Sequence, residues 1–147
     1  MTAASQAGKV VIRQAVAAEI GRLIEIRGAV RENRLSDPTS VTRSDYDWFV
    51  TRGLVWIAIA RDRVAGFSAA DPRDATIWAL FVDPACEGEG FGAMLLERAL
   101  FDLTAAGHGE ARLFTDPGTK AARLYRKLGW REQGLTADAE MEFRLNL

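Results

Sequence analysis

Hydrophobic positions near the start of the chain change from a strand-like to a helix-like spacing. Residues 9–14 form a short β-branched run that is typical of a strand, and Ile20, Leu23 and Ile24 then recur at helical intervals. Turn-forming residues begin after Arg31, so the pattern predicts a strand followed by a helix that ends near this residue.

A second, short helix is predicted from a cap at Ser44 to Gly53, because Tyr46, Trp48 and Phe49 lie close together between these two residues. Three apolar runs follow, at residues 54–60, 64–70 and 75–82. A parallel crossover needs a dozen or more residues, and the turns between these runs are much shorter. The three runs are therefore expected to form an antiparallel meander.

The rest of the chain alternates helices and strands. A long amphipathic helix is predicted at residues 90–106, a strand at 111–115 and a short helix at 119–128. Two closing strands are predicted at residues 130–135 and 140–147. Because a helix separates the strands at 75–82 and 111–115, these two are expected to be parallel.

These elements predict one α/β (α+β) domain with the element order βααβββαβαββ. Its mixed central sheet has about seven strands, with helices on both faces. Residues 9–147 are assigned to this domain, and residues 1–8 are expected to be a flexible N-terminal tail. The strand at 54–60 or the last strand is a candidate for pairing two copies into a homodimer.

Composition narrows the classes of protein further. The chain has 147 residues, 48% of them hydrophobic, with 19 Lys and Arg against 20 Asp and Glu. This balance excludes a disordered chain and gives no electrostatic argument for nucleic acid or an anionic membrane as partner. We expect a cytoplasmic protein, because the sequence shows neither a signal-like start nor a membrane-length apolar run. With Cys86 as its single cysteine, the chain offers no internal disulfide and no cluster for a metal site.

Glycines cluster where an apolar strand is followed by the long helix, in the string VDPACEGEGFGAML. Main-chain amides of such a loop converge on an anion at the positive end of a helix. The cluster predicts either a site for a phosphate-bearing ligand or a connector that only turns the chain.

The dinucleotide fingerprint is a rival interpretation of this loop. Gly88, Gly90 and Ala93 satisfy the pattern, and Asp116 lies roughly 20 residues further on. However, five residues (83–87) separate the strand from the first glycine, and a meander precedes the loop instead of a βαβ unit. A nucleotide-binding oxidoreductase fragment therefore remains the weaker interpretation.

The order of two segments resembles the GNAT superfamily of N-acetyltransferases, which use acetyl-coenzyme A. The first segment is the strand ending LFVDP with its glycine loop and helix, and the second is TKAARLYRKLGW after a later strand. With the meander before them and two strands after them, the resemblance covers nearly the whole domain.

The resemblance implies a coenzyme site built mainly from the main chain. Backbone groups of Leu80, Phe81 and Val82 should pair with the pantetheine arm, and an amide near Phe81 or Val82 should stabilise the oxyanion. The parallel strands at 75–82 and 111–115 should splay apart to open a cleft. The pyrophosphate should bind the amides of Gly88, Glu89, Gly90, Phe91, Gly92 and Ala93.

Three positions depart from the family pattern. Glu87 and Glu89 occupy places where the family usually has Gln, Arg or other basic residues, and two carboxylates beside a pyrophosphate should weaken its binding. Gly118 replaces an Asn that often contacts the pantetheine arm. Lys120 and Arg123 are candidates for compensating charge.

Tyr125 matches the tyrosine that the family uses as a general acid, and a phenol at this position can donate a proton to the departing thiolate. The alternative is that Tyr125 only packs on an apolar helix face. The general base is left open, with Glu25, Glu32, Asp74 and Glu142 as candidates, because Thr76 stands where some relatives place a glutamate.

The acceptor side is expected at residues 27–48 and 136–139, which flank the cleft in this topology. Trp48 is expected near substrate, and Arg31 or Arg34 is a candidate for binding a substrate carboxylate. The sequence thus predicts transfer of acetyl from acetyl-CoA to a primary amine of a small molecule, an amino acid or a protein terminus, by direct attack in a ternary complex. The alternative is a non-catalytic acyl-CoA binding or sensing domain.

Overall fold

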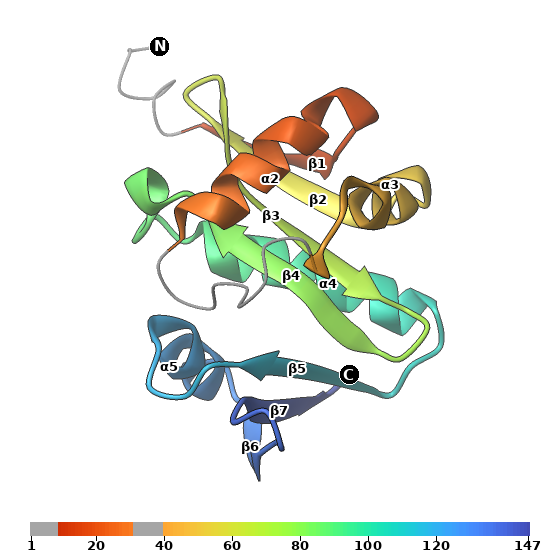
Figure 1. Ribbon diagram of the computed structural model, residues 1–147, viewed down its shortest axis with the longest axis vertical. Helices are drawn as coiled ribbons and strands as arrows, with labels where there is room; N and C mark the ends of the chain where they lie inside the picture. Colours follow the sequence, from red (N-terminus) through yellow and green to blue (C-terminus); the bar gives the residue numbers. More distant parts are fainter. Residues whose placement is uncertain (1–8, 31–39) are drawn as a thin grey trace.

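A seven-stranded mixed β-sheet forms the centre of the computed structural model, which describes residues 9–30 and 40–147 (Figure 1). The tail expected at residues 1–8 lies outside the described residues. The strands lie in the order β1-β2-β3-β4-β5-β7-β6, and neighbours are antiparallel except β4 and β5, which are parallel as expected. The strands are β1 (Val10–Gln14), β2 (Val55–Ala60), β3 (Arg63–Asp71), β4 (Thr76–Val82), β5 (Glu110–Thr115), β6 (Arg131–Leu135) and β7 (Met141–Asn146).

Helices cover both faces of this sheet, which confirms the predicted fold class. Buried residues of α2 and α3 pack on one face of β2 to β4, and α4 packs on the other face together with α5 (Figure 1). The helices are α2 (Ile20–Ala29), α3 (Arg43–Thr51), α4 (Phe91–Ala105) and α5 (Lys120–Lys127), with short 3-10 turns η1 (Ala17–Glu19) and η3 (Pro84–Cys86). Within the described residues, no helix has the length and apolar character needed to cross a membrane.

The boundaries of the first two helices differ from the prediction. Helix α2 ends at Ala29, before Arg31, and Ile24 on this helix is 42% exposed. Helix α3 is capped by Thr42 and not by Ser44. The Thr42 hydroxyl accepts a hydrogen bond from the Asp45 main-chain N–H, and the Asp45 carboxylate accepts one from the Thr42 N–H, so the two residues form a capping box.

The strands proposed for dimer pairing are not edges of the sheet. Strand β2 lies between β1 and β3, and β7 lies between β5 and β6, so the main chain of each is already paired on both sides. The expectation that either strand pairs two copies is therefore wrong. Among the described strands, β1 and β6 form the two edges of the sheet.

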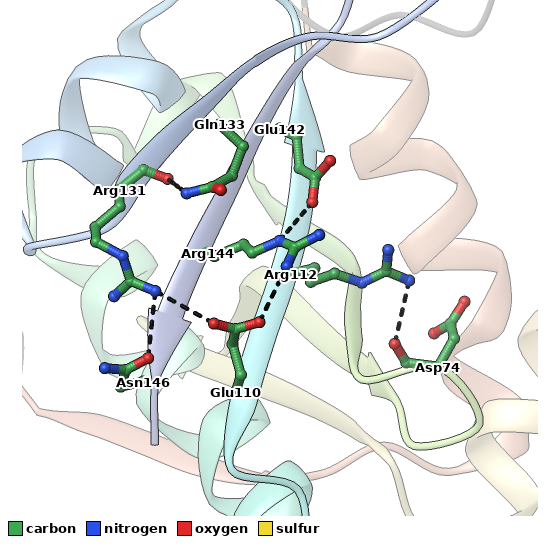
Figure 2. A network of polar contacts seen from close by, with 8 residues as sticks. All are labelled: Asp74, Glu110, Arg112, Arg131, Gln133, Glu142, Arg144 and Asn146. Carbon is green, nitrogen blue, oxygen red and sulfur yellow. Dashed lines mark hydrogen bonds and ion pairs between the residues drawn. The ribbon is translucent and has the colours of Figure 1, made fainter.

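Charged side chains of β5, β6 and β7 form a network on the sheet face opposite α5. Figure 2 shows Arg144 between Glu142 and Glu110, at 2.8 and 3.4 Å, and Arg131 reaching Glu110 at 3.2 Å. Alternate residues of β5 point to the other face, where Ala111 and Leu113 are buried beneath α5. One half of the sheet thus has an apolar face under a helix and a polar face toward solvent.

Gly66 in β3 lies where the neighbouring strand and helix leave no room for a side chain. A Cβ atom there would lie 2.7 Å from the main-chain oxygen of Phe81 and 3.2 Å from Leu95 Cδ1. We expect Gly66→Ala to lower the free energy of unfolding by about 1–3 kcal/mol, because β4 must shift to admit the methyl group. Urea denaturation measures this change.

Gly21→Ala is the matched control, because Gly21 is an exposed residue of α2 with nothing within 4 Å of an added Cβ. This variant should gain roughly 0.5 kcal/mol through the lower entropy of its unfolded chain. Equal stability of the Gly66→Ala variant and the wild type would contradict the packing argument.

Candidate active site

Two cavities meet between β4 and β5. The first, here called the helix-side cavity, has a volume of about 920 Å³ and extends along the start of α4. The second, the strand-side cavity, has a volume of about 660 Å³ and extends along β5 to the loop between β6 and β7. Residues that line both cavities are Leu80, Phe81, Ala121 and Tyr125. A ligand in one cavity can therefore meet a ligand in the other beside these residues.

The cavities exist because β4 and β5 are joined at one end only. Within these two described strands, the single ladder pair is Thr76 with Arg112, and the Arg112 N–H donates to the Ala75 oxygen at 2.9 Å. On its other side β4 is paired with β3 along its length, but Ala69 faces Ala79 while Ala70 faces Ile77. This register leaves one extra residue in β4, which marks a β-bulge that bends the strand. The expected splay of the two strands is thus present.

The start of α4 forms one end of the helix-side cavity. Gly90 is the N-cap residue with φ of 86°, a left-handed conformation that favours glycine, and no side chain caps the helix. The first main-chain N–H groups of an α-helix have no partner inside it, so this end is suited to an anion. Predicted residues that line this cavity are Leu80, Phe81, Val82, Gly88, Gly90, Phe91, Gly92 and Ala93.

Two of the predicted loop residues contribute differently from their neighbours. The Phe91 side chain is only 2% exposed and packs in the core beneath α4, which leaves its main chain for binding. The Glu89 side chain turns away to the β2–β3 turn, where both its carboxylate oxygens accept hydrogen bonds from Arg61 at 3.0 Å. This contact lowers the pKa of Glu89, and Glu89 does not line the cavity.

Glu87 does line the helix-side cavity, and its carboxylate lies 3.5 Å from the Lys120 ammonium. Both acidic residues of the loop therefore have a cationic neighbour. The repulsion expected between this loop and a pyrophosphate is reduced accordingly, most for Glu89, whose charge is held outside the cavity.

Asp83 holds the loop at the end of β4. Its carboxylate accepts a hydrogen bond from the Ala85 N–H at 2.9 Å and pairs with Arg22 of α2 at 2.7 Å, and both contacts lower the pKa of Asp83. Its main-chain N–H donates to the Ala65 oxygen at 2.7 Å. The glycine loop therefore starts from a point fixed to α2 and β3.

Tyr125 of α5 lies where the two cavities meet. Its side chain is 6% exposed, and its ring packs against Trp130 and Phe143, each with ring centres 5.8 Å apart. Burial raises the pKa of the phenol, so the hydroxyl stays protonated at neutral pH. Tyr125 thus belongs to the apolar core and also lines both cavities.

The strand-side cavity carries charges of both signs. Arg27 of α2 lines it, as do three carboxylates that follow β5 or precede β7, which are Asp116, Asp138 and Glu140. Burial raises the pKa of Glu140, and the nearby carboxylates of Asp116 and Asp138 raise it further. Among the described residues, no group of three or more His, Cys, Asp or Glu is placed to hold a metal ion.

The base candidates from the sequence lie elsewhere or outside the described residues. Glu25 pairs with Arg22, Asp74 accepts a hydrogen bond from the Thr76 hydroxyl, and Glu142 pairs with Arg144. None of these three lines the strand-side cavity. Glu32 falls outside the described residues, as do Arg31 and Arg34.

Sequence reasoning missed Glu140, although it placed the neighbouring loop at 136–139 beside the cleft. It also named the segment that begins at Arg27 without singling this residue out. The available signal was the position of Asp116 and Glu140, which follow β5 and precede β7 and so meet where these two paired strands end and begin. Trp48 is half-buried on α3, with the guanidinium carbon of Arg73 3.8 Å from the centre of its ring. It lines neither cavity.

Comparisons with known proteins agree with this architecture. The family model of the acetyltransferase (GNAT) domain matches residues 51–132. The chain is 34% identical over 101 residues to a mycothiol acetyltransferase from Clavibacter sepedonicus, a match that covers 63% of this chain and 33% of that protein. It is 30% identical over 84 residues to the chloroplastic serotonin N-acetyltransferase 2 of Oryza sativa subsp. japonica, covering 52% of this chain and 41% of that protein. The matches thus span less than half the length of these curated relatives.

Solved structures share the fold over nearly the whole chain. A putative acetyltransferase from Salmonella typhimurium, solved with its cofactor acetyl-CoA, has a TM-score of 0.77 at 20% identity and covers 95% of this chain and 94% of its own. The PaiA N-acetyltransferase from Thermoplasma acidophilum, solved with coenzyme A, has a TM-score of 0.76 at 17% identity. The match covers 95% of this chain and 99% of that one. Since the family model matches more than half of the sequence and these neighbours share its fold, the chain belongs to the GNAT acetyltransferase family.

Proposed function

We propose that the protein is an N-acetyltransferase that moves an acetyl group from acetyl-CoA to a primary amine by direct attack in a ternary complex. The observation that carries the proposal is the convergence, at one cavity, of the uncapped N-terminus of α4, the unpaired edge of β4 and Tyr125. These supply an anion site, main-chain hydrogen-bonding groups and a proton donor. The names of these two curated relatives contain two unrelated compounds, mycothiol and serotonin, so the acceptor of this chain must be inferred from its own residues.

The helix-side cavity fits the coenzyme. The amides of the loop and of the first turn of α4, from Gly88 to Ala93, would hold the pyrophosphate, with Lys120 as a nearby cation. The main chain of Leu80, Phe81 and Val82 lies on the edge of β4 that β5 leaves free, where it would hold the pantetheine arm. When bound, acetyl-CoA supplies an acetyl group activated as a thioester.

Tyr125 is proposed to hold the proton that the leaving sulfur takes up. Its raised pKa keeps the phenol protonated, but it also makes the phenol a weaker acid. Desolvation in the same cavity raises the pKa of a thiol too, and the two effects offset each other. The transfer therefore stays feasible although Tyr125 is buried.

Glu140 is proposed to accept the proton that an ammonium must lose before it can attack. A carboxylate with a raised pKa is a stronger base than an ordinary glutamate, and Asp116 and Asp138 beside it favour a cation at this place. Glu140 and Tyr125 both line the strand-side cavity, so the base and the acid would serve one reaction centre.

Calorimetric titration with acetyl-CoA tests the function, with NAD⁺ run alongside. We expect saturable one-site binding of acetyl-CoA alone, and thiol release when amines are added. In the Glu87→Gln variant, binding should tighten by about 2- to 5-fold at low salt, because a carboxylate is removed from the cavity.

Glu89→Gln is the matched control, with the same change in net charge but a side chain held by Arg61 outside the cavity, and its effect should be smaller. Binding without thiol release for any amine would favour a non-catalytic acyl-CoA binding domain. No binding at all would overturn the proposed function, while the family assignment from sequence and fold would stand.

Tyr125→Phe should lower kcat by about 100-fold while leaving the Kd for acetyl-CoA nearly unchanged. The ring contacts with Trp130 and Phe143 remain in this variant, so its urea midpoint should move little. Thiol release under saturating substrates measures kcat. If the variant turns over as fast as the wild type, Tyr125 is a packing residue and not the acid.

Glu140→Gln should lower kcat/KM by about 100-fold and remove the fall in activity that the wild type shows as Glu140 becomes protonated at low pH. The same substitution that lowers the activity should raise the stability of the protein. A raised folded-state pKa means that ionised Glu140 costs stability, and the cost appears as the pH rises from the ordinary value of 4.5 through the raised pKa. The Gln variant should therefore be more stable than the wild type at pH 7.

The pH profile and the urea midpoint together decide whether Glu140 is the base. Glu142→Gln is the control, because Glu142 is paired with Arg144 outside the cavity. If the activity of the Glu140→Gln variant still falls at low pH as it does in the wild type, Glu140 is not the general base.

A further inference from the structure

We propose that Arg27 binds a carboxylate of the acceptor, so that the acceptor is a small molecule carrying both an amine and a carboxylate, such as an amino acid. The proposal rests on the proposed acetyltransferase function and names the substrate class of the same site. It is carried by the surroundings of one guanidinium in the strand-side cavity.

Arg27 lies in the last turn of α2 and lines this cavity. Its Nε and Nη1 atoms are buried without a hydrogen-bond partner. The centre of the guanidinium lies 4.6 Å from the centre of the Phe81 ring and 5.7 Å from that of Trp78. It also lies beside the Tyr46 hydroxyl, where it counteracts the effect of burial on the pKa of Tyr46. Among the described residues, no carboxylate forms an ion pair with Arg27.

Arg22, on the same helix, shows what a structural arginine looks like in this protein. Its guanidinium pairs with Asp83 at 2.7 Å and Glu25 at 2.5 Å, and its Nε and Nη2 also donate to the Val64 oxygen. The donors of Arg22 thus form hydrogen bonds within the fold, whereas two nitrogens of Arg27 have no acceptor among the described residues.

Two buried guanidinium nitrogens with no acceptor among the described residues are unfavourable, because arginine stays charged and its buried donors have lost water. The ring contacts stabilise its charge but accept none of its in-plane hydrogen bonds. A carboxylate matches the planar fork of a guanidinium with two parallel hydrogen bonds. Since no described residue supplies this partner, an anionic ligand in the cavity that Arg27 lines is the partner we infer.

The same cavity carries the carboxylates of Asp116, Asp138 and Glu140. These three carboxylates favour a cationic group of a ligand, whereas Arg27 favours an anionic group. The cavity therefore suits a ligand that carries both charges. An ammonium near Glu140 and a carboxylate near Arg27 would fit both, with Phe81 at the junction with the helix-side cavity. A volume of about 660 Å³ suits a small molecule.

The test compares matched acceptors in the wild type and in variants. A panel of amino acids and their carboxamides is assayed by thiol release at saturating acetyl-CoA. The kcat/KM for the best amino acid should exceed that for its amide by about 10-fold or more. Arg27→Met should abolish this preference by lowering kcat/KM for the amino acid alone, and Arg27→Lys should keep part of it.

Arg98→Met is the matched control, because Arg98 is an exposed residue whose guanidinium lies 5.0 Å from the Trp56 ring centre and lines neither cavity. It loses the same kind of ring contact and should keep the preference. Calorimetric binding of acetyl-CoA is measured for every variant. Binding that persists without the preference overturns this proposal alone, whereas loss of binding in the wild type overturns the proposed function.

A second measurement needs no turnover. Acetate and glycine are titrated into the wild-type protein while the Nε–Hε signal of Arg27 is followed by NMR, with glycinamide and sodium chloride as controls. The proposal expects the signal to shift with acetate and glycine and not with the controls. Equal transfer to amino acids and amides, or an Arg27 signal that neither carboxylate moves, would overturn it and favour a neutral amine or a protein N-terminus as acceptor.

Discussion

The site depends on how two parallel strands are fastened, because β4 and β5 are joined at one end and separate along the rest of their length. At the closed end, the Arg112 N–H donates to the Ala75 oxygen, and His108 Nε2 lies 2.6 Å from the Pro72 oxygen. These contacts tie the start of β5 to the turn between β3 and β4. Beyond this point β4 has no ladder pair with β5. The main-chain N–H and C=O groups on this side of β4, which a regular sheet would pair, therefore remain available to a ligand. Both cavities open on this edge, and Tyr125 lies where they meet.

Ion pairs then fix the charges around this opening. Asp83 is held by Arg22, and it also caps the turn that leads into the glycine loop, so one pair positions the loop against α2. Glu89 is held by Arg61 at the opposite end of the same loop. An acidic loop at a helix N-terminus would repel an anion if its carboxylates faced the cavity. Here one carboxylate is turned outward, and the positive end of α4 keeps its effect.

The elements, their order and the glycine loop could be predicted from the sequence, because strand and helix periodicity and the turn residues are local signals. The splay of β4 and β5 followed only from the resemblance to a family. Contacts between distant segments could not be predicted. Nothing local distinguishes Glu89, paired with Arg61 of the β2–β3 turn, from Glu87 in the cavity. The same holds for Glu140, whose raised pKa needs burial and the carboxylate of Asp116 from another segment as well as that of Asp138 in its own loop. Even the α3 cap was misplaced, since Ser44 and Thr42 are both good capping residues and the capping box with Asp45 selects Thr42.

Arg22 and Arg27 show how the fold assigns different roles to the same residue type. The two side chains leave one helix five positions apart, which turns them to different parts of the sheet. Arg22 meets the end of β4, where Asp83 neutralises it. Arg27 meets the aromatic part of β4, where the faces of Phe81 and Trp78 stabilise a cation and offer no hydrogen-bond acceptor. Apart from the Tyr46 hydroxyl beside it, the guanidinium is held by rings, so its Nε and Nη1 donors remain for a ligand. In the proposed function the acyl donor is held mainly by main chain, which any sequence supplies, so selectivity for the acceptor would come from side chains such as Arg27 on the facing helix.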